Sequence, residues 1–282
     1  MPIHPTAVVA PECEIADGVD IGPYCVLSGR VKLGARVRLV GSVYLSGPVT
    51  IGPDTIVYPF ACLGFPAQDV KFKLGDKTAG VVVGAGGILR EHVTIHAATN
   101  DHTPTTIGDR AFMMGNTHVG HDGRLGNNVI MVNNSALAGH ARADDNCILS
   151  GGALVHQFNR VGRLAMLSGG TAISADVPPF CIASGRNIMV GINLVGLRRN
   201  GFSREDVTKV REAYRAAFRA GLTRPEMLRT LEDLGRGCPL VMEMARFVAE
   251  AKKVCPSLER AGGHRVGGRT PEEASVEAEA PM

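Results

Sequence analysis

Aliphatic side chains recur at every sixth position through the first part of the chain. The first run comprises Ile3, Val9, Ile15, Ile21, Leu27, Leu33, Leu39, Leu45, Ile51, Val57 and Leu63. The second comprises Val83, Leu89, Ile95, Asp101, Ile107, Met113, Val119, Leu125, Met131, Leu137, Ala143, Leu149, Val155, Val161, Leu167 and Ile173, and only Asp101 is polar. Neither the 3.6-residue period of a helix nor the two-residue period of a strand gives this repeat. A parallel β-helix does, because each six-residue unit is a short strand and a corner with one aliphatic residue pointing inward.

Three such units form one triangular coil, so the two runs predict nine coils of a parallel β-helix. The step from Leu63 to Val83 is not a multiple of six, and we expect residues 65–82 to be an insertion that leaves the solenoid. The repeat fades after Ile173, and the segment DVPPF at 176–180 indicates an exit, since proline cannot donate to a strand ladder. We therefore assign residues 1–185 to the β-helix domain.

The hydrophobic period becomes helical from Ser203. Ser203 and Asp206 resemble a capping box, and the spacing predicts one helix that stops at Gly221 and a second that opens at Thr223. A third is predicted over residues 240–254. We assign 186–261 to a linker and a small α-helical domain. The Gly-, Glu- and Pro-rich residues 262–282 are expected to be a disordered tail.

Composition narrows the class of protein. Trp is absent and aromatic residues are 5%, so aliphatic side chains must fill the core. A net charge of +3 gives no reason to expect nucleic acid as a partner. Seven cysteines without a CxxC pair are typical of reduced thiols in the cytoplasm. We see no signal peptide and no apolar run long enough to cross a bilayer.

Histidines align on the predicted solenoid. Residues eighteen apart stack in successive coils, so His121, His140, His156 and Gln157 fall within one residue of a single column. His118 lies in the same coil as His121. A lone histidine here would be solvated or a satisfied edge residue, which is how we interpret His96, two coils earlier. The clustering of the others favours a functional site.

Acid–base chemistry is our preferred interpretation of this column. A neutral imidazole is suited to act as a general base near pH 7, and Asp122 could hold the tautomer of His121. The N–H of Gly139 could stabilise an oxyanion, although glycine is also common at tight corners. Three histidines could instead hold zinc, as in the gamma-class carbonic anhydrases, but the sequence spacing of their ligands differs from the spacing here. We expect no metal.

Charged residues outside the column are candidate substrate contacts. Asp69 and Lys71 lie in the predicted insertion, where they are either solvated or able to bind polar or phosphate groups. Arg198 and Arg199 precede the first predicted helix and could contact phosphate, or could simply be exposed.

Seven segments together resemble one enzyme family. They are LGFPAQDVK, REHVTIHAAT, NTHVGHD, NNSALAGH, LVHQF, DVPPF and NLVGLRRNGFSRE. In sequence and order they are similar to the acyl-[acyl-carrier-protein]–UDP-N-acetylglucosamine O-acyltransferases of lipid A synthesis. The resemblance spans residues 1 to about 255.

The resemblance implies a fold and an assembly. It implies a mainly β chain that forms a left-handed parallel β-helix, and a cytoplasmic homotrimer with active sites in clefts between adjacent subunits. The partners it implies are UDP-N-acetylglucosamine and an acidic acyl carrier protein, which would meet basic surface on the C-terminal helices. No cofactor is implied beyond the phosphopantetheine of the carrier.

The resemblance also implies residue roles. His121 matches the general base that deprotonates the sugar 3-hydroxyl, Asp122 its partner, and Gly139 the oxyanion donor. Cleft-lining positions match Asp69, Lys71, His118, His140, His156, Gln157 and Asn193. Arg199 matches a residue near the pantetheine and the substrate phosphates. Gly169 falls where the family measures acyl length, and its lack of a side chain predicts a long acyl group.

The chain departs from the family pattern in places, and other functions stay open. Asn200 replaces a second basic residue, and the segment between Gly185 and Gly191 is one residue shorter and lacks a histidine. An acyltransferase with another acceptor, including a 3-amine, or with an acyl-CoA donor is the first alternative. A zinc hydratase and a non-catalytic scaffold are the others.

Overall fold

The computed structural model describes residues 3–258, and over most of that range the chain winds into a triangular prism of three parallel sheets. Sheet A contains β1 (Val8–Val9), β4 (Val26–Ser28), β7 (Tyr44–Ser46), β10 (Cys62–Leu63), β13 (Thr94–Ile95), β16 (His118–Val119), β19 (Ala136–Leu137), β22 (Leu154–Val155) and β25 (Ala172–Ile173). Sheet B contains β2 (Glu14–Ile15), β5 (Val31–Leu33), β8 (Val49–Ile51), β11 (Val81–Val83), β14 (Thr105–Ile107), β17 (Arg124–Leu125), β20 (Arg142–Ala143) and β23 (Arg160–Val161).

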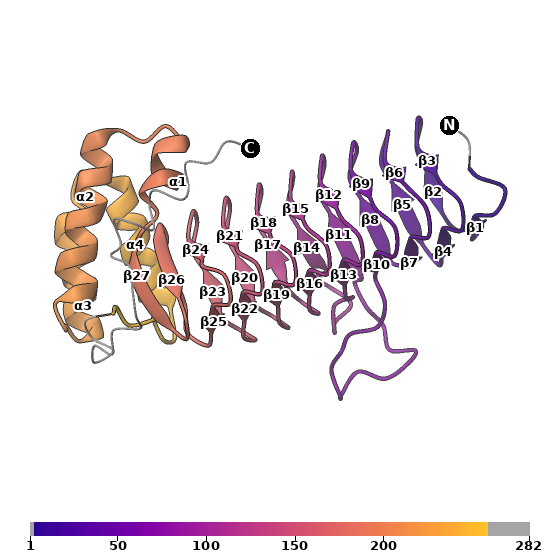
Figure 1. Cartoon of the computed structure of the whole chain (residues 1–282). Helices are drawn as coiled ribbons and strands as arrows, with labels where there is room; N and C mark the ends of the chain where they lie inside the picture. Colours follow the sequence, from indigo (N-terminus) through magenta and orange to yellow (C-terminus); the bar gives the residue numbers. More distant parts are fainter. Residues whose placement is uncertain (1–2, 259–282) are drawn as a thin grey trace.

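Sheet C completes the prism and continues past it. It contains β3 (Asp20–Ile21), β6 (Arg38–Leu39), β9 (Ile56–Val57), β12 (Ile88–Leu89), β15 (Phe112–Met113), β18 (Ile130–Met131), β21 (Ile148–Leu149), β24 (Met166–Leu167), β26 (Cys181–Ser184) and β27 (Ile188–Ile192). The chain visits sheets A, B and C in turn, so each coil adds one short strand to each sheet (Figure 1).

The six-residue repeat supplies the core, as the sequence predicts. From Ile21 onward its aliphatic members point into the prism and are almost completely buried; Leu27, Leu45, Leu63, Ile95 and Val119 of sheet A are at most 1% exposed. The corners between strands require a left-handed backbone conformation at one residue. Asparagine fills several of these positions, for example Asn116 and Asn134, since its short polar side chain tolerates positive φ.

Two excursions leave the corner between sheets A and B. The larger runs from the end of β10 to the start of β11 and projects from the prism (Figure 1), as predicted. The second, residues 96–104 between β13 and β14, was not predicted. Val81 pairs with Thr105, twenty-four residues on rather than eighteen, so the six-residue unit that contains Asp101 stands outside the coil. The assignment of Asp101 to an inward position is wrong for that reason.

A hairpin and a helical region close one end of the prism (Figure 1). Strand β27 pairs antiparallel with β26, so sheet C extends beyond the domain boundary that we placed at residue 185. The helical region comprises α1 (Leu194–Arg199), α2 (Arg204–Tyr214), a π-helical turn η1 (Arg215–Arg219), α3 (Arg224–Leu234) and α4 (Pro239–Glu250).

The predicted helices occur with small differences. The Ser203 hydroxyl caps α2 by accepting from the Asp206 N–H at 3.0 Å. Helix α1 was missed because it has only six residues. Helix α4 ends at Glu250, before the predicted end, because Ala251 is extended and the following residues return to the prism, where Val254 bridges Asp176.

The C-terminal end of the chain lies outside the described residues. The predicted tail, residues 262–282, and the last residues of the predicted helical domain lie outside the described residues. None of the helices in residues 3–258 has the length and hydropathy needed to span a membrane.

Candidate active site

His121 and Asp122 form a hydrogen-bonded pair at the corner between β16 and β17. His121 is 8% exposed, and its Nδ1 lies 2.8 Å from Oδ2 of Asp122. Because an ionised carboxylate only accepts, Nδ1 carries the hydrogen, and the lone pair is left on Nε2. In its neutral form the ring therefore presents an unprotonated Nε2 on the side away from Asp122.

Asp122 is held by more than the imidazole. Its oxygens accept the Thr99 hydroxyl at 2.8 Å, the Thr99 N–H at 3.2 Å and the Asn100 side-chain amide at 2.9 Å. Burial raises the pKa of Asp122, but hydrogen bonds from His121 and Thr99 outweigh it, and the pKa lies below its ordinary value. The carboxylate is ionised at neutral pH.

Gly139 packs directly against the His121 ring. A Cβ at this position would lie 2.5 Å from Nε2, closer than side chains approach one another. The φ of Gly139 is not positive, so the contact with the ring, rather than a left-handed backbone, requires glycine. Within residues 3–258, the Gly139 N–H makes no hydrogen bond to the protein. It is available to a bound group close to Nε2.

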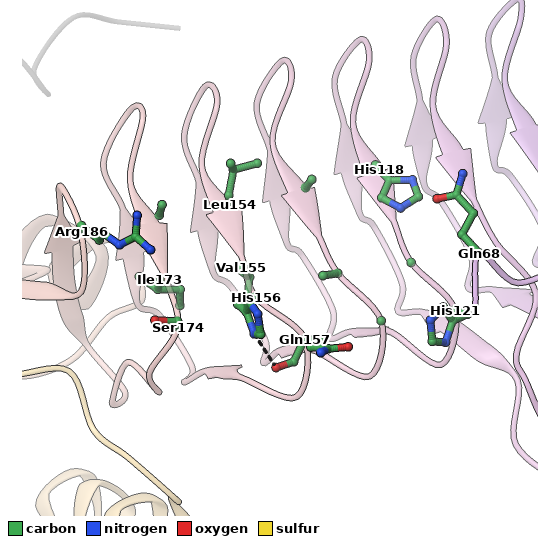
Figure 2. Close-up of a pocket in the computed structure, with 15 residues that line it drawn as sticks. Gln68, His118, His121, Leu154, Val155, His156, Gln157, Ile173, Ser174 and Arg186 are labelled. Atoms are coloured by element: carbon green, nitrogen blue, oxygen red, sulfur yellow. Dashed lines mark hydrogen bonds between the residues drawn. The ribbon is translucent and has the colours of Figure 1, made fainter. Parts of the chain in front are cut away.

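A groove of about 530 Å³ runs along the outer face of sheet A beside this corner (Figure 2). Its lining residues are Gln68, His118, Gly120, His121, Ala136, Ala138, Gly139, Leu154, Val155, His156, Gln157, Ala172, Ile173, Ser174 and Arg186. Gln68 and His118 lie at one end, and Ser174 and Arg186 at the other (Figure 2). The outward residues between those ends, Ala136, Leu154 and Ala172, are apolar.

His118 lines the groove near the insertion, and the half-buried His96 packs beside it, with Nδ1 2.8 Å from the Pro66 carbonyl oxygen. Their rings meet edge to face with centroids 5.4 Å apart. Nδ1 of His118 lies 2.8 Å from the Thr94 hydroxyl. Burial lowers the pKa of His118 to about 4, and nearby His96 and His121 add to the effect. His118 is therefore neutral at physiological pH and offers hydrogen bonds rather than charge.

His140 occupies the corner position directly after Gly139. Its ring stacks on Phe158 with centroids 4.6 Å apart, and Nε2 lies 3.6 Å from Oδ2 of Asp122. Ligand atoms of His121, Asp122 and His140 all lie within 4.8 Å of one another, the proximity that a cation would need. Asp122 already accepts hydrogens from Thr99, Asn100 and His121, so a cation would have to displace its bond to His121.

The histidines and Gln157, which the sequence analysis placed within one residue of a single column, lie in three adjacent rows along the corner between sheets A and B. Register places His121 beside Gly139 and Gln157, whereas His140 stacks between Asp122 and Phe158. His156 and Gln157 are exposed and line the groove. Nδ1 of His156 donates to the Gln157 carbonyl oxygen at 3.2 Å.

Several predicted site residues do not join the groove within one chain. Asp69 caps its own loop by accepting the Lys71 N–H at 2.8 Å, and the Lys71 side chain is exposed. Asn193 is buried as the N-cap of α1, where it accepts the Gly196 N–H. Arg199 is exposed at the end of α1. Gly169 lies at the corner between sheets C and A and is absent from the groove lining.

Sequence reasoning missed other residues of the site. Gln68, Leu154 and Arg186 line the groove, and Thr99 and Asn100 bind Asp122. Asp101, the one polar residue at an aliphatic position of the repeat, was a signal for Thr99 and Asn100. A polar residue at an inward position indicates that the segment around it has left the coil.

Comparison with known proteins agrees with this geometry. A family model described as UDP N-acetylglucosamine O-acyltransferase, domain 2, matches residues 176–255. An acyl-[acyl-carrier-protein]–UDP-N-acetylglucosamine O-acyltransferase of Thermodesulfovibrio yellowstonii is 41% identical over 253 residues, which cover 89% of this chain and 97% of the relative. The enzyme of the same name from Azorhizobium caulinodans is 50% identical over 248 residues, covering 87% and 91%.

Solved structures agree as well. A UDP-N-acetylglucosamine acyltransferase of Francisella novicida superposes with a TM-score of 0.87 at 31% identity, covering 94% of this chain and 100% of that one. The Moraxella catarrhalis O-acyltransferase gives 0.85 at 34% identity, covering 90% and 98%.

Fold, site and relatives define an O-acyltransferase built on a parallel β-helix. Within that class, the chain belongs to the family of acyl-[acyl-carrier-protein]–UDP-N-acetylglucosamine O-acyltransferases. The family relationship confirms the predicted left-handed parallel β-helix with a short helical C-terminal part.

Proposed function

We propose that this chain transfers a 3-hydroxyacyl group from acyl carrier protein to the 3-hydroxyl of UDP-N-acetylglucosamine, the first step of lipid A synthesis, with His121 as general base. The observation that supports the proposal best is the His121–Asp122 pair, which presents an unprotonated Nε2 beside a groove with an apolar middle. The names of the relatives supply the donor and the acceptor.

The proposed reaction needs one proton shuttle. Nε2 of His121 removes the hydroxyl proton, and the sugar oxygen attacks the thioester carbonyl. Asp122 stabilises the imidazolium that forms. The negative charge on the carbonyl oxygen is met by the Gly139 N–H. The tetrahedral intermediate collapses with cleavage of the C–S bond, and the phosphopantetheine thiolate takes the proton back from His121.

The groove is suited to the acyl chain. From His118 to Ala172 it crosses three strand spacings of sheet A, about 14 Å, over apolar side chains. Gly169 lies outside the lining of this groove, so our hypothesis that Gly169 permits a long acyl group requires the chain to run past the groove. Rates with 3-hydroxyacyl donors of different lengths test it, and a clear preference for the shortest donor would refute it.

We propose a homotrimer in which a neighbouring subunit completes each site. Asp69, Lys71, Asn193 and Arg199 do not line the groove of their own chain, as would be expected if they serve a neighbour. The insertion between β10 and β11 exposes Val70 completely and Leu74 at 94%, and exposed aliphatic side chains on a projecting loop are typical of contact surfaces.

The carrier protein, further substrate contacts and the cellular compartment are also part of the proposal. An acidic carrier protein would dock on basic residues of the C-terminal helices, for example Arg204 and Arg211 of α2. His156, Gln157 and His140 would contact the substrates from the three adjacent rows beside His121. No metal and no cofactor other than the carrier's phosphopantetheine takes part, and the reaction is cytoplasmic.

His121→Ala tests the mechanism. We expect at least a hundredfold loss of kcat with an unchanged melting temperature, because the variant lacks the Asp122-paired imidazole that takes the hydroxyl proton. Mass spectrometry of the product from a defined 3-hydroxyacyl carrier protein and UDP-N-acetylglucosamine gives both the rate and the site of acylation. His92→Ala, an exposed histidine on another corner, is the matched control.

Three results would contradict the proposal. The first is near-normal 3-O-acylation by His121→Ala. The second is acylation of another acceptor or from acyl-CoA in preference to the proposed substrates. The third is stoichiometric zinc in the purified protein together with loss of activity on chelation, which would favour a hydratase-type site at His121, Asp122 and His140.

A further inference from the structure

The excursion at residues 96–104 bends back over the catalytic corner instead of projecting away from it. The Thr99 hydroxyl and N–H both point to the Asp122 carboxylate, and the Asn100 amide binds its other oxygen, Oδ1. The Asp122 N–H donates to the buried Thr105 hydroxyl at 2.8 Å, which fixes the backbone of the same residue. Asp122 is thus bound at the main chain and at both carboxylate oxygens.

We propose that Thr99 and Asn100 are positioning residues for acyl transfer, which hold the Asp122 carboxylate in the orientation that keeps Oδ2 on Nδ1 of His121. The inference rests on the proposed function, since it assigns a task to the Asp122–His121 pair. Both residues bond directly to the Asp122 carboxylate and neither lines the groove of its own chain, so we assign them a role that passes through Asp122.

The hydrogen bonds leave the carboxylate a single orientation. Rotation about its terminal torsion would break the Thr99 bond to Oδ2 and the Asn100 bond to Oδ1 together. Bonds to an ionised acceptor are stronger than neutral ones, so this rotation is costly. With both donors removed, only the Thr99 N–H and His121 hold the carboxylate, which can then turn toward His140, so Nδ1 of His121 loses a fixed acceptor.

The donors themselves are anchored by main-chain bonds. Asn100 accepts the N–H groups of His102 and Thr103 through Oδ1, at 3.0 and 2.8 Å. The Ala98 N–H donates to the Gly80 carbonyl, and the Ala98 carbonyl accepts the Thr78 hydroxyl at 2.6 Å. The excursion is therefore tied to the end of the insertion by hydrogen bonds of the protein itself.

The titratable groups near Asp122 within the described residues are mainly histidines. His121 and His140 face it from the corner, and His118 and His96 lie beyond His121. Asp101 and His102, on the excursion itself, are exposed and pair with each other at 2.9 Å. The loss of Thr99 or Asn100 donors therefore changes hydrogen bonding to Asp122 without removing a charge from the site.

Thr99→Val removes the hydroxyl donor and keeps the volume and the N–H. We expect kcat to fall about tenfold with KM for both substrates within twofold of wild type, and Thr99→Ser to restore kcat. Thr103→Val is the matched control, since the Thr103 hydroxyl makes no hydrogen bond within the described range. Asn100→Ala gives a second, independent variant, and melting temperatures establish that each one folds.

A double-mutant cycle separates this inference from the proposed function. In the Asp122→Asn background, Thr99→Val should cause no further loss of kcat, because its effect passes through the carboxylate. A full additional loss in that background, an unchanged kcat for Thr99→Val and Asn100→Ala, or failure of serine to rescue would overturn the inference. Full activity of Asp122→Asn or of His121→Ala would instead overturn the proposed function.

Discussion

At the scale of single residues, the site depends on close contacts as much as on charge. Gly139 is the clearest case, because its Cα lies under the imidazole of His121 and any Cβ would collide with it. The sequence left two interpretations of this glycine, a corner and an oxyanion donor. The structure adds a third requirement, which is space for the His121 ring. The spacing of residues along the sequence does not reveal this requirement.

We predict that Gly139→Ala lowers kcat at least a hundredfold while the protein stays folded. The added methyl group must push the ring away from Gly139, which moves Nε2 from the position where it meets the hydroxyl. Steady-state kinetics and a thermal melt measure the two effects. Gly151→Ala is the control, because a Cβ there has no neighbour closer than 3.7 Å. Equal losses in both variants would contradict the explanation.

A second residue-scale prediction concerns pH and His118. Its pKa is about 4 in the folded chain and 6.5 without the fold, so the unfolded chain binds the proton first as pH falls. The native state therefore loses stability, relative to His118→Asn, between about pH 6.5 and 4. Above pH 6.5 the difference between the two proteins should be constant.

Urea unfolding at pH 7 and at pH 4 measures this effect. Between pH 7 and pH 4, we expect the free energy of unfolding of the wild type to fall by about 2 kcal/mol more than that of His118→Asn. This is less than the pKa shift alone would give, because His118 is partly exposed. The same comparison for the exposed His156→Asn is the control. No relative change with pH would show that His118 titrates normally.

At the scale of elements, the sequence predicts what periodicity controls. The six-residue repeat identifies the inward positions of all three sheets because every coil must bury one aliphatic residue per strand. It also brings His121, Gly139 and Gln157 to one corner. The same period of eighteen places His140 beside Asp122, one row away from His121, and the register of sheet A agrees.

The excursion at 96–104 and the hairpin of β26 and β27 were missed for another reason. The excursion spans a full six-residue unit, so the frame resumes in phase after it and hides the departure from the coil. The hairpin follows two prolines and replaces the repeat by antiparallel pairing, which has no six-residue period. Both elements depend on tertiary contacts rather than on local pattern.

The groove on sheet A leads to a prediction about donor length. Ala172→Met places a flexible side chain on the groove floor, three strands beyond His118. We expect the ratio of kcat/KM for long against short 3-hydroxyacyl donors to fall about tenfold, since the long chain loses apolar contact. Thr50→Met, on the outer face of sheet B, is the control. An unchanged ratio would show that the acyl chain lies elsewhere.

At the scale of the whole molecule, a single chain holds the base but not every expected substrate contact. His121 and its groove lie at the corner between sheets A and B, whereas Arg199 ends α1 in the helical region. In a cyclic trimer one surface of each chain meets a different surface of the next. We propose that an interface of this kind brings Arg199 of one subunit to His121 of its neighbour, so that each site takes residues from two chains.

Co-expression of two inactive variants tests this sharing. His121→Ala and Arg199→Ala should each be nearly inactive alone. In mixed trimers, a site is intact where a chain with His121 meets a chain with Arg199, and random assembly of equal amounts gives about a quarter of wild-type activity. His121→Ala co-expressed with Asp122→Asn should stay inactive, because those two residues belong to one corner of one chain. Sedimentation should give three times 29.7 kDa. If the first mixture is as inactive as the second, Arg199 and His121 act within the same subunit.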